Sequence, residues 1–332
     1  MSTHVAGIDA DYNRAIREPL RAVEDVVHAQ LHSSVKMVVD VSNHLFAAGG
    51  KRLRPSLVLL SAQACNPASG RARLIDVAAS AELIHMATLM HDDVIDKADS
   101  RRGRSTANSR WGNHVSVLSG DYILARAFSL LSKNGDMKIM QVLSRATSAM
   151  VEGEIRQMEA NGNTQELIAA YETIIRNKTA EFVSACCTIG AVVAEASKEY
   201  ERALELFGEN CGMAFQVTDD LLDLTGDPAK TGKPIGGDIR EGKITMPVIL
   251  TLQRASAEDA ARIEEIIHGN AASAEEIKWI RRMAEETGAL DGACTVAERY
   301  VEEAVHNLHL LPESESRTCL EELARGIVGR RS

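Results

Sequence analysis

The chain of 332 residues carries a formal net charge of −10, and 4% of its residues are aromatic. An acidic chain without aromatic stacking platforms or Lys/Arg runs is not a general nucleic-acid binder. The length suffices for one large domain or two modest ones, and the abundance of Ala, Leu, Ile, Val and Met favours helices over a β-sandwich.

Helical periodicity recurs along nearly the whole chain. Gly49-Gly50 marks the end of one predicted helix, Pro55 suits the first turn of the next, and Asn66-Pro67 ends that helix. The predicted helices cover residues 10–33, 35–48, the stretch between Pro55 and Asn66, 72–97, 113–132, 136–160, 164–177, 179–196 and 199–224, with four shorter helices in the remainder.

Two polar segments, residues 98–109 and 225–243, are expected to be loops between these helices. No stretch shows convincing strand alternation, and no Pro/Ser-rich linker divides the chain. We therefore expect one all-α domain over residues 1–332.

The cysteines lack C-x-x-C spacing, and most lie in apolar helical context. This favours reduced, buried thiols over a disulfide or a zinc site. The N-terminus has no apolar core long enough for a signal peptide, and no window resembles an uncharged membrane span, so we expect a cytoplasmic protein. The cysteines are Cys65, Cys186, Cys187, Cys211, Cys294 and Cys319.

Two acidic clusters of the form Asp-Asp-x-x-Asp interrupt apolar helical stretches. The first acidic cluster comprises Asp92, Asp93 and Asp96, and the second acidic cluster comprises Asp219, Asp220 and Asp223. Carboxylates this close repel one another unless cations compensate, and the helix dipole disfavours them at a helix C-terminus. Residues four apart share one helix face, so each cluster offers a pair of oxygen ligands suited to Mg²⁺. The alternative is two solvated acidic turns near helix ends.

Three basic segments in the loops supply possible anion-binding groups. Taken singly, each is more often surface charge, but Arg forks and Lys side chains beside Gly suit diphosphate recognition. No G-x-x-x-x-G-K-[ST] motif or dinucleotide fingerprint accompanies them. The sequence therefore indicates substrates that carry diphosphates, with Mg²⁺ between them and the Asp residues. The basic residues are Lys51, Arg52 and Arg54; Arg101, Arg102 and Arg104; and Lys233 and Lys243.

The ordered set of motifs over residues 45–250 resembles the signature of the trans-polyprenyl diphosphate synthases, and the C-terminal quarter is similar to their long-chain, octaprenyl-type bacterial members. The resemblance implies a helical bundle around a central cavity. It also implies head-to-tail condensation of an allylic diphosphate, such as farnesyl diphosphate, with several isopentenyl diphosphates. The matching segments are Gly49–Pro55, Glu82–His85, His91–Asp96, Arg101–Gly103, Lys178–Ala180, Gln216–Asp223 and Gly232–Lys243.

The resemblance also implies residue roles. Two or three Mg²⁺ ions are expected on Asp92, Asp96 and Asp219, supported by Asp93, Asp220 and Asp223. The allylic diphosphate is expected on Arg101, Lys178 and Lys233, with Lys243 helping to close the loop. Isopentenyl diphosphate is expected on Lys51, Arg54, His85 and Arg102, although His85 taken alone reads as a helix-face histidine. Thr179, Gln216 and the Lys178 carbonyl are expected to stabilise the allylic cation, and the departing diphosphate to accept the proton.

Product length is expected to depend on the helix that precedes Asp92. Ala87 and Thr88 lie about one turn before it and are small, whereas a Phe or Tyr there closes the pocket in short-chain relatives. Small residues on a long helix are also common close-packing positions. The channel is predicted to continue past Ile84, Ala81 and Ser80 toward a floor that includes Phe128, Leu130 and Leu131.

Three alternatives remain open beside a long-chain synthase. A short-chain geranylgeranyl or farnesyl diphosphate synthase shares every motif. A terpene cyclase lacks the second acidic cluster and the Gly49–Pro55 segment, and a non-catalytic subunit of a heteromeric synthase could lose the aspartates that this chain retains. The resemblance implies a homodimer, for which the apolar stretch 114–131 is a candidate interface.

Overall fold

In the computed structural model, the described residues are 13–66, 71–101, 103–226, 235–269 and 272–329. Among them are sixteen α-helices, one π-helical segment and one pair of very short strands. The helices are α1 (Asn13–Gln30), α2 (Lys36–Ala47), α3 (Leu53–Cys65), α4 (Arg71–Ile95), α5 (Ala107–Trp111), α6 (Asn113–Asn134), α7 (Met137–Ala160), α8 (Thr164–Ile175), α9 (Glu181–Val193), α10 (Lys198–Thr225), α12 (Gly237–Arg240), α13 (Met246–Arg254), α14 (Ala257–His268), α15 (Ala274–Glu286), α16 (Ala289–Leu308) and α17 (Glu315–Val328). The π-helical segment η1 covers Arg176–Ala180, and the strands are β1 (Ser100–Arg101) and β2 (Arg104–Ser105).

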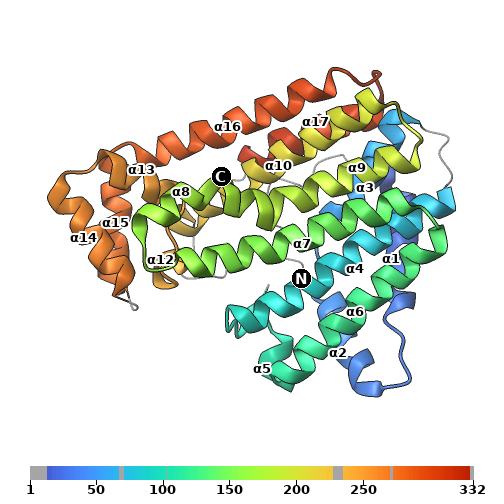
Figure 1. Cartoon of the computed structure of the whole chain (residues 1–332), viewed down its shortest axis with the longest axis horizontal. Coiled ribbons are helices and arrows are strands. Elements are labelled where there is room, and N and C mark those ends of the chain that lie inside the picture. The colour runs from blue at the N-terminus through green and yellow to red at the C-terminus, as the bar shows by residue number, and fades with distance from the viewer. Residues whose placement is uncertain (1–12, 67–70, 102, 227–234, 270–271, 330–332) are drawn as a thin grey trace.

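The core lies around α9, whose residues are almost all buried. Helix α9 packs against α3, α7 and α10, while α10 also packs along α16 and α4 packs along α6. Figure 1 shows these long helices running side by side, with α13, α14 and α15 gathered at one end and α5 at another. The all-α fold expected from composition and periodicity is confirmed.

The predicted helices are found close to their expected bounds, with differences where local pattern is uninformative. The predicted helices 164–177 and 179–196 form one continuous path, because η1 joins α8 to α9 without a break. Five helices, α13 to α17, follow the second polar segment instead of four, and α16 is long. The start of the first predicted helix, at residue 10, lies outside the described residues.

The segment 98–109 is more ordered than the loop expected from its polar sequence. Strands β1 and β2 pair antiparallel, with Ser100 opposite Ser105 and Arg101 opposite Arg104. Two residues per strand are too few to produce an alternation pattern, which explains why the sequence did not reveal the hairpin. Helix α5 then begins at Ala107, one residue after its N-cap Thr106.

By length and composition, the Asn113–Lys133 stretch of α6 is the one described helix that could cross a membrane. The same criterion is met by core helices of soluble proteins. Helix α6 packs along α4, and its Arg126 donates to Gln30 of α1 at 2.7 Å.

Candidate active site

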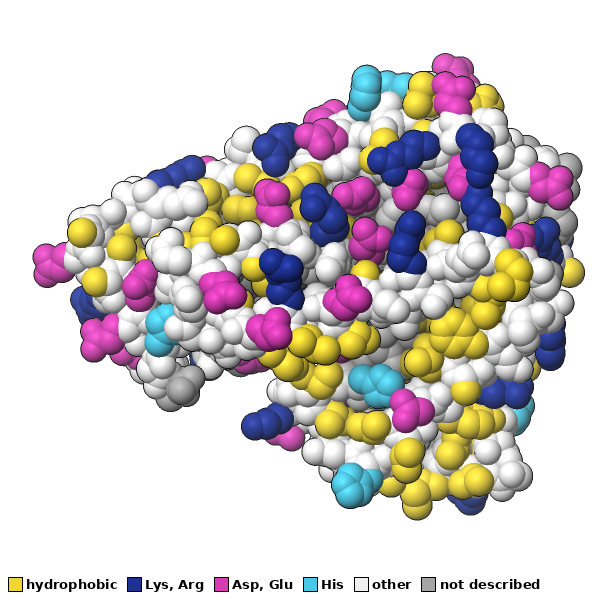
Figure 2. Space-filling model, in the orientation of Figure 1, with side chains coloured by type: hydrophobic (Ala, Val, Ile, Leu, Met, Phe, Trp, Pro, Cys, Tyr) yellow, Lys and Arg dark blue, Asp and Glu magenta, His cyan; other side chains and the backbone are white. Residues whose placement is uncertain are grey.

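The two acidic clusters lie near the C-terminal ends of α4 and α10. Figure 2 shows the outline hollowed between the end of the molecule that carries α12 to α15 and the end that carries α5. The ends of α4 and α12 lie on the two sides of this hollow in Figure 1. Lys243 lies 4.0 Å from Asp96 of the first acidic cluster and within electrostatic range of Asp238, which adjoins the second acidic cluster, so the two clusters belong to one region of the fold.

Within the first acidic cluster, the middle aspartate points away from its neighbours. Asp93 is buried, and one of its carboxylate oxygens accepts from Arg101 Nε at 2.7 Å. Asp92 is half-buried and Asp96 is exposed. This division follows from helix geometry, since residues four apart share a face and the residue between them is rotated by about 100° per position.

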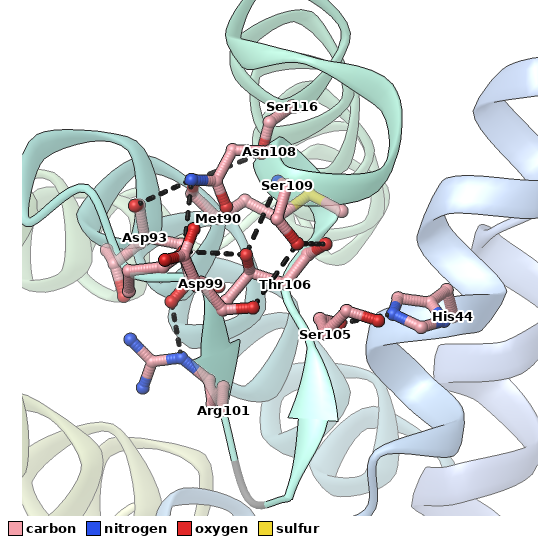
Figure 3. A network of polar contacts seen from close by, with 12 residues as sticks. His44, Met90, Asp93, Asp99, Arg101, Ser105, Thr106, Asn108, Ser109 and Ser116 are labelled. Atoms are coloured by element: carbon pink, nitrogen blue, oxygen red, sulfur yellow. Dashed lines mark hydrogen bonds and ion pairs between the residues drawn. The ribbon is translucent and has the colours of Figure 1, made fainter.

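Side-chain hydrogen bonds to backbone carbonyl groups hold the residues after the hairpin against the end of α4, as Figure 3 shows. Asn108 Nδ2 donates to the carbonyl oxygens of Asp93 and Ala98, both at 3.1 Å, and Thr106 Oγ1 donates to Ala98 O at 2.7 Å. The other side of the hairpin is linked to α2 by a contact of 2.7 Å between His44 Nε2 and Ser105 O. Arg101 is therefore held beside the first acidic cluster by several independent contacts.

Asp92 lies in a field of mixed charges. Burial, the Asp96 carboxylate and Glu154 raise the pKa of Asp92 to about 6, although Lys178 and Arg101 act in the opposite direction. Arg101 and Lys178, two of the three cations predicted to hold an allylic diphosphate, thus lie within electrostatic range of the first acidic cluster.

Lys178 lies on η1, which is wedged between α7 and α10. A Cβ atom on Gly153 of α7 would come within 2.9 Å of the Lys178 side chain, and one on Gly212 of α10 within 2.4 Å of Ala180 Cα. Glycine at these positions therefore permits both helices to approach η1 closely. Lys178 Nζ lies 2.5 Å from Glu154 Oε2 and donates to Gln157 Oε1 at 2.7 Å, so α7 orients it.

The second acidic cluster repeats the division seen in the first. Asp219 is exposed, whereas Asp220 is buried and Asp223 is half-buried. The Asp223 carboxylate accepts from the backbone N–H of Gly237 at 3.1 Å and of Asp238 at 3.2 Å, and so caps the short helix α12.

Asp238 adds a fourth carboxylate beside the second acidic cluster. Burial, followed by the charges of Asp223 and Asp220, raises the pKa of Asp238 well above its usual range, and Lys243 lowers it. Negative charge is thus in excess at this side of the site.

Lys243 connects the first acidic cluster to the segment after α12. Its Nζ lies 2.6 Å from Glu241 Oε2 and 4.0 Å from Asp96 Oδ1, and its backbone N–H donates to Asp238 O at 2.8 Å. The hydrogen bond to Glu241 and the charges of Asp238 and Asp96 raise the pKa of Lys243 above its ordinary value, although burial alone lowers it. A protonated Lys243 between the clusters brings the segment after α12 next to the first acidic cluster.

Thr179 and Gln216, predicted to lie together near the reacting carbon, are in direct contact. Thr179 Oγ1 donates to Gln216 Oε1 at 2.9 Å, and Gln216 Nε2 donates to Asp220 Oδ1 at 3.0 Å. The close approach of Gly212 to η1 explains the contact, because Gln216 follows one turn later on the same helix face.

The predicted isopentenyl site lies where the segment before α3 meets α4. Arg52, with a left-handed φ of 50°, is buried against the face of Phe46 and pairs with Glu82 at 2.9 Å and Glu24 at 3.0 Å. Arg54 lies near Glu82, and burial lowers the Arg54 pKa. Among the described residues, Arg54 Nε has no hydrogen-bond partner. Lys51 is exposed, and His85, one turn after Glu82, is half-buried.

The predicted chain-length residues lie in or beside the contact between α4 and α6. Ile84 and Ala87 are fully buried, Thr88 is half-buried, and its hydroxyl donates to His85 O at 2.8 Å within its own helix. On α6, Leu130 and Leu131 are buried, and Phe128 packs against the core. These positions are apolar or have their polar groups satisfied inside the helix.

Two predicted substrate ligands, Arg102 and Lys233, lie outside the described residues. Sequence reasoning assigned no role to Glu82, Glu154, Gln157, Tyr171 or Asp238, all of which contact predicted site residues or lie near them. Asp238 could have been noticed as an acid between Gly236-Gly237 and Lys243. The others occupy ordinary helical positions, where nothing local distinguishes them.

The donor set fits a hard divalent cation. The carboxylates form an oxygen-only set in which burial, and after it the neighbouring carboxylates, raise the pKa of Asp92 and Asp238. In the described part of the chain, no three His, Cys, Asp or Glu side chains already converge as a metal site. Divalent cations such as Mg²⁺ typically take one or two protein carboxylates and complete their shell with water and substrate phosphates.

Several known proteins align with nearly the whole length of this chain. A heptaprenyl diphosphate synthase component 2 from Geobacillus stearothermophilus is 36% identical over 93% of this chain and 95% of its own length. An all-trans-nonaprenyl-diphosphate synthase (geranyl-diphosphate specific) from Rhodobacter capsulatus is also 36% identical, over 93% of this chain and 94% of its own.

Among solved structures, a polyprenyl synthase from Caulobacter crescentus complexed with calcium and isoprenyl diphosphate superposes with a TM-score of 0.91 at 35% identity, covering 100% of this chain and 99% of that one. The family described as Polyprenyl synthetase matches residues 35–284. The chain therefore belongs to the polyprenyl synthetase family.

Proposed function

We propose that this chain is a long-chain trans-polyprenyl diphosphate synthase, a prenyltransferase that extends an allylic diphosphate with several isopentenyl diphosphates. The observation that carries the proposal is the juxtaposition of two acidic clusters with the cations Arg101, Lys178 and Lys243. Carboxylates alone would suit many cation sites. Cations positioned beside them add the second element that a metal–diphosphate complex requires.

We assign two or three Mg²⁺ ions to Asp92, Asp96 and Asp219, with the remaining aspartates of the clusters in support. When bound, Mg²⁺ neutralises the charge that grows on the departing diphosphate. Arg101 and Lys178 hold the same diphosphate, and their own anchors, Asp93 and Glu154, fix where their charges lie.

Isopentenyl diphosphate has no bond to ionise, so its site needs positioning cations. Lys51, Arg54 and His85 fill this role in our assignment. Arg54 is half-buried, and its Nε is shielded from solvent without a hydrogen-bond partner among the described residues, which supports the assignment because a shielded N–H favours a bound acceptor such as a diphosphate oxygen. Arg102 belongs to the same assignment from its sequence motif.

The allylic cation forms when the carbon–oxygen bond breaks, and neutral oxygens can stabilise it without trapping it. The Thr179 hydroxyl, the Gln216 amide and the Lys178 carbonyl provide such dipoles. After the new bond forms, the departing diphosphate takes the proton, so no strongly basic side chain is needed.

The proposal of a long product is supported by relatives named as heptaprenyl and nonaprenyl synthases and by the small side chains at Ala87 and Thr88. The purified chain, incubated with Mg²⁺, isopentenyl diphosphate and farnesyl diphosphate, should release products of seven or more isoprene units on chromatography. A dominant farnesyl or geranylgeranyl product would identify a short-chain synthase instead.

A second possibility is that the chain works as one subunit of a two-chain synthase, because two relatives are named as a component 2. The retention of all six aspartates supports a catalytic chain. Activity of the purified chain alone, its dependence on Mg²⁺, and loss of activity in Asp92→Ala and Asp219→Ala separate a self-sufficient enzyme from a scaffold. A terpene cyclase would release diphosphate without consuming isopentenyl diphosphate.

We further propose a cytoplasmic homodimer. Hydrophobic side chains are exposed on the antiparallel helices α6 and α7, and Figure 2 shows such side chains over this face. A second copy would cover them. Sedimentation should give twice the chain mass, and Leu118→Glu should give monomers. The exposed hydrophobic residues on this face are Val117, Leu118, Val151, Ile155 and Met158.

The cytoplasmic part of the proposal rests on the cysteines. All six cysteines are free thiols, as in a reducing compartment.

A further inference from the structure

Three separate elements converge on the carboxylate of Asp220. Tyr171 of α8 donates its hydroxyl to Asp220 Oδ2 at 2.5 Å, and Gln216, one turn earlier on α10, donates Nε2 to Oδ1 at 3.0 Å. The backbone at Met246, the first residue of α13, lies close enough to the carboxylate and to the Tyr171 hydroxyl to lower the pKa of both. Asp220 is 3% and Tyr171 5% exposed, so water does not compete for these bonds.

This network decides which way the Gln216 amide faces. An ionised carboxylate only accepts hydrogen bonds, so the amide must turn its NH₂ group toward Asp220. Its carbonyl oxygen then faces the other way, toward η1, where it accepts from Thr179. Without Asp220, the two orientations of the amide would differ little in energy, because the Thr179 hydroxyl can also accept.

Tyr171 fixes the carboxylate in turn. With Oδ2 held by the tyrosine hydroxyl, rotation about the Cβ–Cγ bond of Asp220 is restrained, and Oδ1 remains in place for Gln216. Removing that hydroxyl would let the carboxylate turn, and the Gln216 amide would lose its single preferred orientation.

We propose that Tyr171 and Asp220 are positioning residues that orient the Gln216 amide and, through it, the Thr179 hydroxyl toward the reacting allylic carbon. This inference rests on the proposed prenyl transfer, in which Gln216 and Thr179 stabilise the allylic cation. It gives the middle aspartate of the second acidic cluster a different task from its exposed neighbour Asp219.

The test compares Tyr171→Phe with Tyr300→Phe. Tyr300 of α16 is 7% exposed and lies within electrostatic range of Tyr171, but its hydroxyl bonds to Arg299 and not to the Asp220 carboxylate. Tyr300→Phe is therefore a control that removes a nearby buried hydroxyl without removing a bond to Asp220. In steady-state assays of isopentenyl incorporation, Tyr171→Phe should lower kcat roughly tenfold or more, because misplaced dipoles act in the transition state. The KM values for both substrates should change less than about twofold, and Tyr300→Phe should match the wild type.

A double-mutant cycle separates positioning from a loss of packing. In a Gln216→Ala background, Tyr171→Phe should lower kcat no further, since its effect passes through the missing amide. An unchanged kcat in Tyr171→Phe, or full additivity with Gln216→Ala, overturns the inference.

A neutron crystal structure of Tyr171→Phe, which distinguishes the amide nitrogen from the oxygen, provides a readout that does not depend on activity, and it should show the Gln216 side chain displaced from Asp220 or in more than one orientation. A single wild-type orientation contradicts the inference. If the wild type incorporates no isopentenyl unit, the proposed function fails, and the Gln216 orientation in this variant still decides whether Tyr171 positions it.

Discussion

Glu82→Gln probes the contact that anchors the segment before α3. The Arg52 and Glu82 side chains are 9% and 6% exposed and lie 2.9 Å apart, so the substitution leaves a buried guanidinium without its nearest charge. Breaking such a pair costs about 3–5 kcal/mol. Glu24, 3.0 Å from Arg52 Nε, keeps part of the compensation. We therefore expect the free energy of unfolding to fall by about 2–4 kcal/mol.

Urea unfolding with linear extrapolation measures this loss. Glu24→Gln is the matched control, because it removes the other carboxylate from the same guanidinium but at a side chain that is 45% exposed, where a pair contributes about 1 kcal/mol or less. Replacing both members of the buried pair, as in Arg52→Met with Glu82→Met, should recover much of the loss, since no buried charge remains.

The same substitution has a consequence for binding. Arg52 lies between Lys51 and Arg54, so a less firmly held Arg52 should displace both predicted ligands. The KM for isopentenyl diphosphate should then rise roughly fivefold, while the KM for the allylic substrate stays nearly unchanged. Equal stability losses in Glu82→Gln and Glu24→Gln would refute the claim that burial makes the Arg52–Glu82 pair dominant. Equal changes in both KM values would refute the link between this pair and the isopentenyl site.

The remaining predictions concern product length and pH. Ala87→Phe should end the product after two or three isoprene units, because Ala87 lies about 7.5 Å before Asp92 along α4; chromatography of the products checks this, and an unchanged length rejects a channel along that face. Mg²⁺ with inorganic diphosphate should raise the melting temperature less at about pH 5 than at about pH 7, because Asp92 has a raised pKa of about 6 and protons then compete with the cation for its carboxylate. Calorimetric scans measure this, and an equal rise in melting temperature at both pH values contradicts it. Without metal, Asp92 and Asp220 have raised pKa values of about 6 in the folded state against 3.8 in the unfolded chain, so the folded state binds more protons in this window. Their contribution to stability should therefore increase as the pH falls from about 6 toward 4, and a mutant lacking both carboxylates should lose that increment.

The fold class and most helix bounds could be predicted because both depend on local pattern. Periodicity identifies α4 and α10, and the Asp-Asp-x-x-Asp spacing alone places two carboxylates on one face of each helix. The hairpin β1–β2 and the π-helical segment η1 were missed for a physical reason. The hairpin is too short for alternation, and η1 lies where Gly153 and Gly212 of two other helices approach it closely, a tertiary contact that no local pattern reveals.

The partners of the site residues were less predictable than the residues themselves. Lys178 could be named from its motif, but its anchor Glu154 lies on α7, 24 positions earlier in the chain. Tyr171 reads as an ordinary core aromatic until the fold brings it to Asp220. Such pairings depend on which helix faces pack together, and a single sequence carries little information about that choice.

In both acidic clusters the middle aspartate is buried and binds other parts of the protein. A third aspartate placed directly after the first must point about 100° away from the outer pair, and toward the protein interior. There Asp93 holds Arg101 of the hairpin, and Asp220 holds Gln216 together with Tyr171 and the start of α13. The middle aspartates thus bind neighbouring protein segments, as does Asp223, which caps α12, whereas Asp92, Asp96 and Asp219 are the cation ligands in our assignment. The first cluster holds the hairpin, and the second cluster holds α12 and the start of α13. Lys243, or a cation near Asp96, therefore joins two parts of the site that are each already anchored to their own helix.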